Sequence, residues 1–365
     1  MVLQTQVLQF GTSRFLQAHA DLFFSQADAD MTVTVVQSSG DTSRQHRLAA
    51  LADPSGFPVR VKGLEQGQEI DREERVTSVK QCFSTAQDWD DVCRVGAGVS
   101  YILSNTSDRG YDAQPSDLDA QFTNDMSFPA KLTHLLHYRF KTGAKAPTLL
   151  PTELIPDNGD VLKTRVLDLA EAVFNDVAFA TWLQAMPAAN SIVDRIVSEP
   201  IEPAGAVAEP YALWALQKAD GLSLPFTHPA IEWVDSLEEA ERLKLHILNL
   251  GHTYIADLWQ VKDWPKDMNV LDFMRGDHCA DLMHLYETEV IPAFALKGLE
   301  SKARAYVATT VDRFANPFLD HRIADIAQNH GQKIDRRIGA FVSWIHATDP
   351  ECRLPTLSAI LKKGT

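Results

Sequence analysis

The run Gln9-Phe10-Gly11-Thr12-Ser13-Arg14-Phe15 stands between a candidate strand, Val7–Phe10, and a candidate helix, Arg14–Ala27. A glycine between a strand and a helix is typical of a dinucleotide-binding turn, because the free N–H groups of the helix N-terminus attract a diphosphate. Only Gly11 of the usual three glycines is present, so an ordinary strand-to-helix turn is the alternative. The run favours a Rossmann-like fold with Gly11 at the cofactor.

Strand-like and helix-like segments alternate up to about residue 200, which predicts a parallel sheet with crossover helices. The further candidate strands are Thr32–Gln37, Val59–Lys62, Ser100–Asn105, Thr148–Leu154 and Ile192–Val197. The further candidate helices are Ser43–Leu51, Ala130–Phe140 and Asp160–Leu183.

The pattern changes at Pro200–Ala206, where prolines and small residues interrupt both the strand-like and the helix-like spacing of apolar residues. Beyond this point helical periodicity dominates, in Leu213–Leu216, Leu237–Leu258, Leu271–Leu285, Ala303–Phe314, Ile323–Ile326 and Ile334–Ile345. The sequence therefore predicts an α/β fold class. An N-terminal Rossmann-like NAD-binding domain over residues 1–200 is followed by a mostly α-helical substrate and catalytic domain over residues 201–365.

A chain of 365 residues with 45% hydrophobic residues suits two domain cores. The formal net charge of −15 argues against nucleic acid or an anionic membrane as a partner, since phosphates would be repelled. A small anionic substrate is compatible with this charge, because a binding site needs only a few local cations. We therefore expect a small-molecule partner.

The four cysteines, Cys82, Cys93, Cys279 and Cys352, are scattered without a C-x2-C pair. The N-terminal run lacks the basic start of a signal peptide, and no charge-free stretch reaches membrane-spanning length. A cytoplasmic protein is expected. Because His278, Cys279 and His284 are irregularly spaced on an acidic helix, no metal site is expected.

The run Lys244-Leu-His-Ile-Leu-Asn249-Leu-Gly-His252 places an amine, an amide and an imidazole within nine residues. At about 100° per residue of α-helix, Asn249 lies ~140° and His252 ~80° around the axis from Lys244. All three side chains could therefore line one wall of a cleft and carry proton transfer. The alternative is a partly buried amphipathic helix with a snorkelling lysine and a hydrogen-bonded histidine.

Two loops at expected strand ends are candidates for cofactor contacts, because ligands of open α/β sheets bind beyond the carboxyl ends of the strands. Asp41 follows the second strand, where a carboxylate can bind the adenosine ribose and repel a 2′-phosphate, which favours NAD over NADP. Arg44 weakens that preference, and Asp41 is also a good helix N-cap. The loop Ser104–Tyr111 is expected to border the nicotinamide ribose.

Several runs together resemble the mannitol dehydrogenase family, the long-chain polyol and uronate dehydrogenases. The Lys-x4-Asn-x2-His element is similar to the family's catalytic element, and Gly11 and Phe15 match its G-x-G-x-F turn, with Ser13 in place of the second glycine. The run Asn190–Val197 resembles N-S-M-V-D-R-I-T, and Arg313–Ile323 resembles the family's R-F-x-N-P block. Ser107 and Asp108 correspond to the family's T-x-T-E-x-G-Y loop.

The resemblance implies NAD as the cofactor, contacted by Gly11, Phe15, Asp41, Ser107 and Asp108. It implies Lys244 as the acid of carbonyl reduction and the base of the reverse oxidation, with Asn249 donating to the developing alkoxide and His252 orienting the substrate or the amine. No metal is required by this chemistry. Members of the family are often monomers, and the sequence does not demand an oligomer.

The substrate side is implied in the same way. Arg313 and His321 are expected at the substrate, where Arg313 could grip a uronate carboxylate bidentately. Asn316 before Pro317 also suits a helix cap. Asp194 is expected to pair with Arg195 or Lys244, in a role that the sequence leaves open.

The segment Leu150–Gly159 discriminates within the family. Mannitol-oxidising members carry C-[DE]-N-x-x-x-N-G, and Leu154 replaces the first asparagine here, so Asn158 or a water would have to substitute for it. The segment resembles instead the tagaturonate reductase (altronate oxidoreductase) branch, which implies reduction of a ketouronate to an aldonate. The alternatives are a polyol 2-dehydrogenase of the mannitol or arabinitol type, and a binding protein that has lost catalysis through Ser13 and Leu154.

Overall fold

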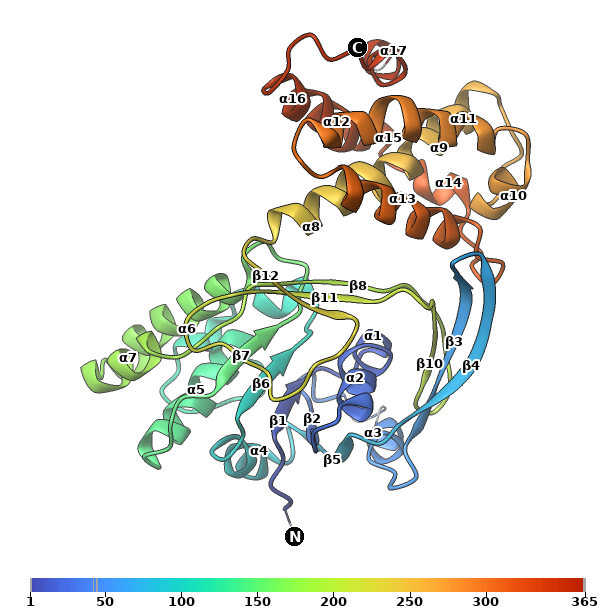
Figure 1. The fold of residues 1–365 in the computed structure, drawn as a ribbon. Coiled ribbons are helices and arrows are strands. Elements are labelled where there is room, and N and C mark those ends of the chain that lie inside the picture. The colour runs from blue at the N-terminus through green and yellow to red at the C-terminus, as the bar shows by residue number, and fades with distance from the viewer. Residues whose placement is uncertain (1, 42, 44, 364–365) are drawn as a thin grey trace. The chain divides into compact units, whose positions relative to one another are not determined.

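The structure is a computed structural model that describes residues 2–41, 43 and 45–363. The chain divides into two compact units (Figure 1). Unit 1 comprises Met1–Val61, Arg72–Ala208 and Ala212–Leu237, and unit 2 comprises Lys62–Asp71, Glu209–Tyr211 and Glu238–Thr365. The division expected at residue 200 thus falls inside unit 1.

Unit 1 is built on a parallel five-stranded sheet with the order β5-β2-β1-β6-β7. Its strands are β1 (Val7–Phe10), β2 (Val33–Gln37), β5 (Val79–Ser84), β6 (Tyr101–Ser104) and β7 (Thr148–Pro151). Counted along the sheet's own strands this order is 3-2-1-4-5, the order of a doubly wound dinucleotide-binding sheet. The central strands are buried throughout, because helices cover both faces.

The crossover helices of unit 1 vary in length, from 4 to 17 residues. They are α1 (Arg14–Gln17), α2 (Ala20–Gln26), α3 (Gln45–Leu51), α4 (Trp89–Gly96), α5 (Phe128–Lys141), α6 (Asn158–Phe174) and α7 (Val177–Gln184), with the 3-10 turns η2 (Asp108–Tyr111) and η3 (Pro115–Leu118). Helices α4 to α7 pack in sequence on one another and share a core with β1 and β6. Rossmann topology is therefore confirmed.

The expected third strand, Val59–Lys62, was wrongly assigned to the parallel sheet. It belongs to β3 (Phe57–Glu65), which forms a second sheet of order β4-β3-β10-β9 with β4 (Gln68–Val76), β9 (Val197–Pro200) and β10 (Ala206–Ala208). Burial alternates along β3, as in a strand with one solvated face. The actual third parallel strand, β5, was missed because Lys80 and Gln81 interrupt its apolar pattern.

A third sheet, of order β12-β11-β8, explains why unit 1 extends to Leu237. Its strands are β8 (Ser191–Asp194), β11 (Leu213–Gln217) and β12 (Ile231–Val234). The helix expected at Leu213–Leu216 is wrong, because this segment is β11 and pairs antiparallel with β8. Trp214, fully buried in β11, shows that tertiary packing decided this short apolar run.

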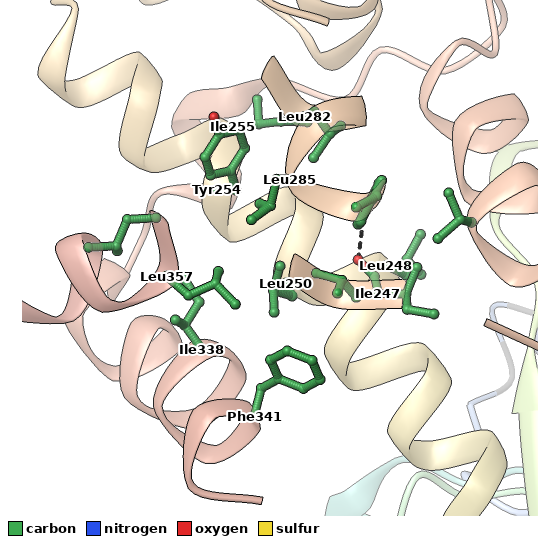
Figure 2. Packing of buried hydrophobic residues seen from close by; sticks show 14 of the residues in the cluster. Ile247, Leu248, Leu250, Tyr254, Ile255, Leu282, Leu285, Ile338, Phe341 and Leu357 are labelled. Carbon is green, nitrogen blue, oxygen red and sulfur yellow. Dashed lines mark hydrogen bonds between the residues drawn. The ribbon is translucent and has the colours of Figure 1, made fainter. Parts of the chain in front are cut away.

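Unit 2 is mostly helical over residues 238–363. It contains α8 (Glu238–Leu243), η4 (Lys244–Asn249), α9 (Leu250–Val261), α10 (Val270–Arg275), α11 (Cys279–Leu285), η5 (Tyr286–Val290), α12 (Ile291–Ala295), α13 (Glu300–Phe314), α14 (Ile323–Ile326), α15 (His330–Lys333), η6 (Ile334–Gly339), α16 (Ala340–His346) and α17 (Pro355–Lys363). The segments η4, η5 and η6 are π-helical turns. Figure 2 shows their core, where Ile247, Leu250, Leu285, Ile338 and Phe341 meet.

Two features are absent from the described residues. No helix among them is long and apolar enough to cross a membrane. The same part of the chain holds no group of three or more His, Cys, Asp or Glu side chains placed to bind a metal ion.

Candidate active site

A cleft of about 510 Å³ opens at the carboxyl edge of the parallel sheet in unit 1. It is formed by the β1–α1 turn, the end of β2, α3, the loop after β6 and the start of α5. Its lining residues are Gly11, Thr12, Ser13, Arg14, Gln37, Ser38, Ser39, Arg47, Asn105, Thr106, Ser107, Arg109, Gly110, Gln114, Asp125, Met126, Ser127, Phe128 and Lys131. The position and size are those of a dinucleotide site in an open α/β sheet.

Gly11 is required by the backbone of this cleft. Its φ is +128°, and a Cβ added there would lie 2.6 Å from the carbonyl oxygen of Asn105. Ser13 has an ordinary φ of −66°, caps α1 through Leu16 N, and donates to Asn105 Oδ1 at 2.9 Å. The serine therefore replaces the family's second glycine without backbone strain. The backbone conformation at Gly11 and Ser13 is therefore compatible with a diphosphate bound at this turn.

The other residues expected at the cofactor are placed differently. Ser107 lines the cleft, and its carbonyl oxygen accepts from Gly110 N at 2.6 Å. Asp108 begins η2, and its side chain lies outside the described part. Phe15 stacks on the ring of His19, with centroids 4.7 Å apart, and is not among the lining residues.

Asp41 also lies outside the lining residues. Its Oδ1 accepts from Ser43 N at 3.0 Å and from Ser43 Oγ at 2.6 Å, the capping alternative of the sequence analysis. Arg44, which was expected to weaken the preference for NAD, lies outside the described residues.

The cations of the cleft were not predicted from the sequence. Arg14, Arg47, Arg109 and Lys131 line it, against the single carboxylate of Asp125 among the described lining residues. Lys131 donates to Ser38 O at 2.6 Å, and burial lowers the pKa of its ammonium to about 8. In the sequence, the run Ser127-Phe128-Pro129-Ala130-Lys131-Leu132-Thr133 resembles the family, and this resemblance was the available signal for Lys131.

The Lys244–His252 run in unit 2 is helical but not regular. Residues Lys244–Asn249 form the π-turn η4, in which hydrogen bonds run from i to i+5. Lys244 and Asn249 are five residues apart, so they lie closer to one side of the helix than the ~140° expected for a regular α-helix. Both are half-buried, and π-turns are frequent at functional sites.

His252 is held as a neutral imidazole. Burial lowers its pKa well below the ordinary value, and the charges of His321, Arg313, Arg337 and Lys333 lower it further. The side chain is 8% exposed, and its Nε2 has no hydrogen-bond partner among the described residues. A buried ring nitrogen in this state can bind a hydroxyl group of a ligand.

The rings of Phe314 and His321 flank His252, at centroid distances of 4.4 and 4.7 Å. Burial also lowers the pKa of His321. Arg337 Nη1 reaches the same region and donates to Thr253 Oγ1 at 3.1 Å and Asn249 O at 3.4 Å. The structure thus brings His252 and His321 together, with Arg337 as a residue that the sequence analysis missed.

Arg313 is occupied within the protein. Its Nε and Nη2 donate to the two carboxylate oxygens of Glu209 at 3.0 and 2.9 Å, and both side chains are buried. The ring of Tyr211 covers the guanidinium at 4.6 Å. The expected bidentate grip on a substrate carboxylate therefore does not fit, because Glu209 already uses that edge of the guanidinium. The Oδ1 of Asn316 accepts from Phe318 N at 3.0 Å and caps the following turn, which is the alternative role expected for Asn316.

Asn158 is a structural tie in unit 1. Its Nδ2 donates to the carbonyl oxygens of Pro151, Glu153 and Ser191, and its Oδ1 accepts from Ser191 N at 2.9 Å. The expected replacement of the missing asparagine by Asn158 is therefore not supported, because its amide is satisfied by backbone groups. Leu154 itself is 75% exposed.

Glu153, beside Leu154, was not singled out from the sequence. Its buried carboxylate accepts from Ser104 Oγ at 3.0 Å and from Thr106 N at 2.9 Å, and burial raises its pKa. It therefore fixes the loop after β6 that lines the cleft. Asp194 ends β8 and is buried in unit 1, next to Arg195, which donates to Ala18 O.

Unit 1 has a doubly wound sheet with a cationic cleft at its carboxyl edge, and the helical unit 2 carries lysine, asparagine and histidine on one segment. These two features define a nicotinamide-dinucleotide-dependent oxidoreductase. The chain belongs to the mannitol dehydrogenase family, since the model of the mannitol dehydrogenase Rossmann domain matches residues 5–227.

Relatives in sequence agree with this placement. The chain is 29% identical to an altronate oxidoreductase of Halalkalibacterium halodurans over 92% of this chain and 70% of that protein. It is 26% identical to an altronate oxidoreductase of Bacillus subtilis over 91% of this chain and 73% of that protein.

Among solved structures, the chain is similar in fold to D-sorbitol dehydrogenase in substrate-free form. The TM-score is 0.80 at 15% identity, with 100% of this chain and 81% of that chain covered. It is also similar to Pseudomonas fluorescens mannitol 2-dehydrogenase in a ternary complex with NAD and D-mannitol. There the TM-score is 0.69 at 16% identity, with 99% and 79% covered.

Proposed function

We propose that the protein is an NAD(H)-dependent reductase of a ketouronate of the tagaturonate or fructuronate type, which it converts to an aldonate. The proposal is carried by Arg337 and Lys333, whose charges act on the neutral His252 beside that of Arg313, which is paired with Glu209. In a chain of net charge −15, such a local excess of cations suits a substrate with a carboxylate. The similarity to altronate oxidoreductases supports the same choice.

The proposed reaction assigns one task to each polar residue of the η4–α9 segment. Bound NADH supplies a hydride to the carbonyl carbon of the substrate. Lys244 donates a proton to the carbonyl oxygen as negative charge builds on it, and takes the proton back in the reverse oxidation. Asn249 donates a hydrogen bond to the same oxygen. The unpartnered Nε2 of His252 orients a neighbouring hydroxyl group of the substrate.

The substrate carboxylate is assigned to Arg337 and Lys333 rather than to the guanidinium edge of Arg313. Arg313 is proposed as a positioning residue, because its ion pair with Glu209 holds a cation near His252 and His321. Gly11, Ser107 and Asp108 remain proposed cofactor contacts, with Phe15 and Asp41 acting through the turns that they stabilise. Asp194 remains a proposed positioning residue.

A polyol 2-dehydrogenase is the second candidate. It is favoured by the occupied guanidinium of Arg313, since a neutral polyol needs no free cation. The two candidates differ in substrate charge, and this difference decides the experiment.

NADH oxidation should be followed with tagaturonate and fructuronate on one side and fructose on the other. We expect turnover on a ketouronate, and expect Arg337→Leu to lower its catalytic efficiency by about 30-fold or more, since an unpaired buried carboxylate costs on the order of 2–5 kcal/mol. Arg336→Leu, at the exposed neighbouring position, is the matched control. Turnover on fructose alone, or equal losses on both substrates, would favour the polyol dehydrogenase.

A further inference from the structure

The adenosine end of the cleft in unit 1 differs from the arrangement that selects NAD. Dinucleotide folds recognise the adenosine ribose at the end of the second parallel strand, through a carboxylate for NAD or an arginine for the 2′-phosphate of NADP. Here the lining residues at the end of β2 and on α3 are Gln37, Ser38, Ser39 and Arg47. Asp41, the nearest acid in sequence, accepts from Ser43 instead of lining the cleft.

The side chains at this end present hydrogen-bond donors. Ser39 Oγ accepts from Gln37 Nε2 at 3.3 Å and from Asp41 N at 3.5 Å, which directs its hydroxyl proton to a further acceptor. Lys131 is 4% exposed and donates to Ser38 O at 2.6 Å, one of the three donors of an ammonium. The Nε of Arg47 is buried and has no partner among the described residues.

The charge of the cleft points the same way. Arg14, Arg47, Arg109 and Lys131 line it, and Asp125 opposes them. Glu202 lies outside the lining residues and binds Arg14 and Arg47 through one carboxylate oxygen, at 2.8 and 3.0 Å. Even with Glu202 counted, cations outnumber carboxylates here, so the cleft suits more phosphate than a diphosphate alone provides.

We infer that this cleft accepts the 2′-phosphorylated dinucleotide NADP(H) as well as NAD(H), and that Arg47, Lys131 and Ser39 bind the 2′-phosphate. Glu202 orients Arg47 and competes with the phosphate for it. The inference rests on the proposed function, because it concerns the cofactor of the same reaction.

The test compares the binding of 2′,5′-ADP and 5′-AMP to the full chain by calorimetry, since these ligands differ only in the 2′-phosphate. We expect 2′,5′-ADP to bind about tenfold more tightly, as one charge-assisted contact provides, and to lose this advantage as salt is raised. Arg47→Gln should lower the ratio of the two affinities by about tenfold, and Glu202→Gln should raise it. Arg94→Gln, an exposed arginine of α4 paired with Asp91, is the control and should leave the ratio as it is.

Weaker binding of 2′,5′-ADP than of 5′-AMP would overturn the inference. A ratio of the two affinities that stays the same in Arg47→Gln would overturn it as well. Retained binding of NADH in that case would leave the proposed function standing. Failure of NADH, 5′-AMP and 2′,5′-ADP to bind would overturn the proposed function itself.

Discussion

Lys244 and His252 lie on the same helical run, but they differ in burial, and this difference suits them to different tasks. His252 is enclosed among cations and rings, which keeps its imidazole neutral and suited to holding a hydroxyl group. Lys244 is half-buried at the start of the π-turn η4. In the proposed reaction, proton transfer is therefore assigned to Lys244 and orientation of the substrate to His252.

Lys244→Ala should lower turnover by about 10²–10⁴-fold, because a positioned acid contributes on this scale to the transition state. NADH binding should persist, since the cofactor cleft is built from residues of unit 1. Steady-state NADH oxidation and a fluorescence titration with NADH measure the two effects. Lys262→Ala, an exposed lysine just beyond α9, is the control, and near-normal turnover by the Lys244 variant would remove this residue from the mechanism.

At the scale of elements, η4 is fixed by its contacts with η5 and with the core of unit 2. Tyr286, fully buried at the start of η5, donates to Ile247 O at 2.9 Å. Gly251 is the second residue of α9, and a Cβ at this position would clash with the Tyr286 hydroxyl group. The π-turn and the tyrosine are therefore fitted to each other.

Gly251→Ala should destabilise the protein by about 1–3 kcal/mol through overpacking, and Tyr286→Phe by about 1 kcal/mol through the lost hydrogen bond. The double variant should lose less than the sum, because removal of the hydroxyl relieves the clash. Urea denaturation measures all three. Gly339→Ala in η6 is the control, since its added Cβ makes only ordinary contacts. Strict additivity would contradict the proposed coupling.

The C-terminal helix α17 depends on a carboxylate from a different element. Glu289 of η5 is buried, and its two oxygens accept from Thr356 N at 2.8 Å and Leu357 N at 3.2 Å. These are N–H groups of the first turn of α17, which no helical partner satisfies. Docking of α17 is thus tied to η5.

Glu289→Gln should lower the free energy of unfolding by about 1–3 kcal/mol, because it weakens hydrogen bonds to a charged acceptor. Chemical denaturation is the measurement. The matched control is Glu287→Gln, two residues earlier, where an exposed ion pair with Arg304 predicts at most about 1 kcal/mol. Equal effects of the two substitutions would show that Glu289 does not anchor α17.

For the whole molecule, Asp21 links stability to pH. The side chain is fully buried, and burial raises the pKa of its carboxyl group from 3.8 to about 7. Between these values the unfolded chain releases the proton while the folded chain retains it, so folding becomes less favourable as the pH rises. The stabilising contribution of the protonated acid is complete below about pH 4 and lost through about pH 7.

Asp21→Asn should therefore increase the free energy of unfolding at about pH 8, by on the order of 2–4 kcal/mol, and have little effect near pH 4. Thermal or urea denaturation across this pH range gives the difference. Asp28→Asn, at an exposed position just beyond the same helix, should change little throughout. A pH-independent effect of Asp21→Asn would contradict the raised pKa.

Much of the fold could be predicted from local patterns. The strand, glycine and helix start around Gly11 formed as expected, and the helices of residues 237–345 follow their apolar periodicity. The failures were β5, β11 and the four-residue run Val59–Lys62 of β3, whose character depends on the partner strand and on which face is buried. A run of four to six residues carries too little periodicity to decide this by itself.

The amino-acid sequence by itself determined the fold class, the helical run of Lys244, Asn249 and His252, and the turn around Gly11, because these depend on consecutive residues. Only the tertiary structure decided which polar groups are engaged. Glu209 reaches Arg313 across 104 residues of sequence, and Lys131 reaches Ser38 across 93. Pairings of this kind depend on the burial and the close approach of distant segments, which no local pattern encodes.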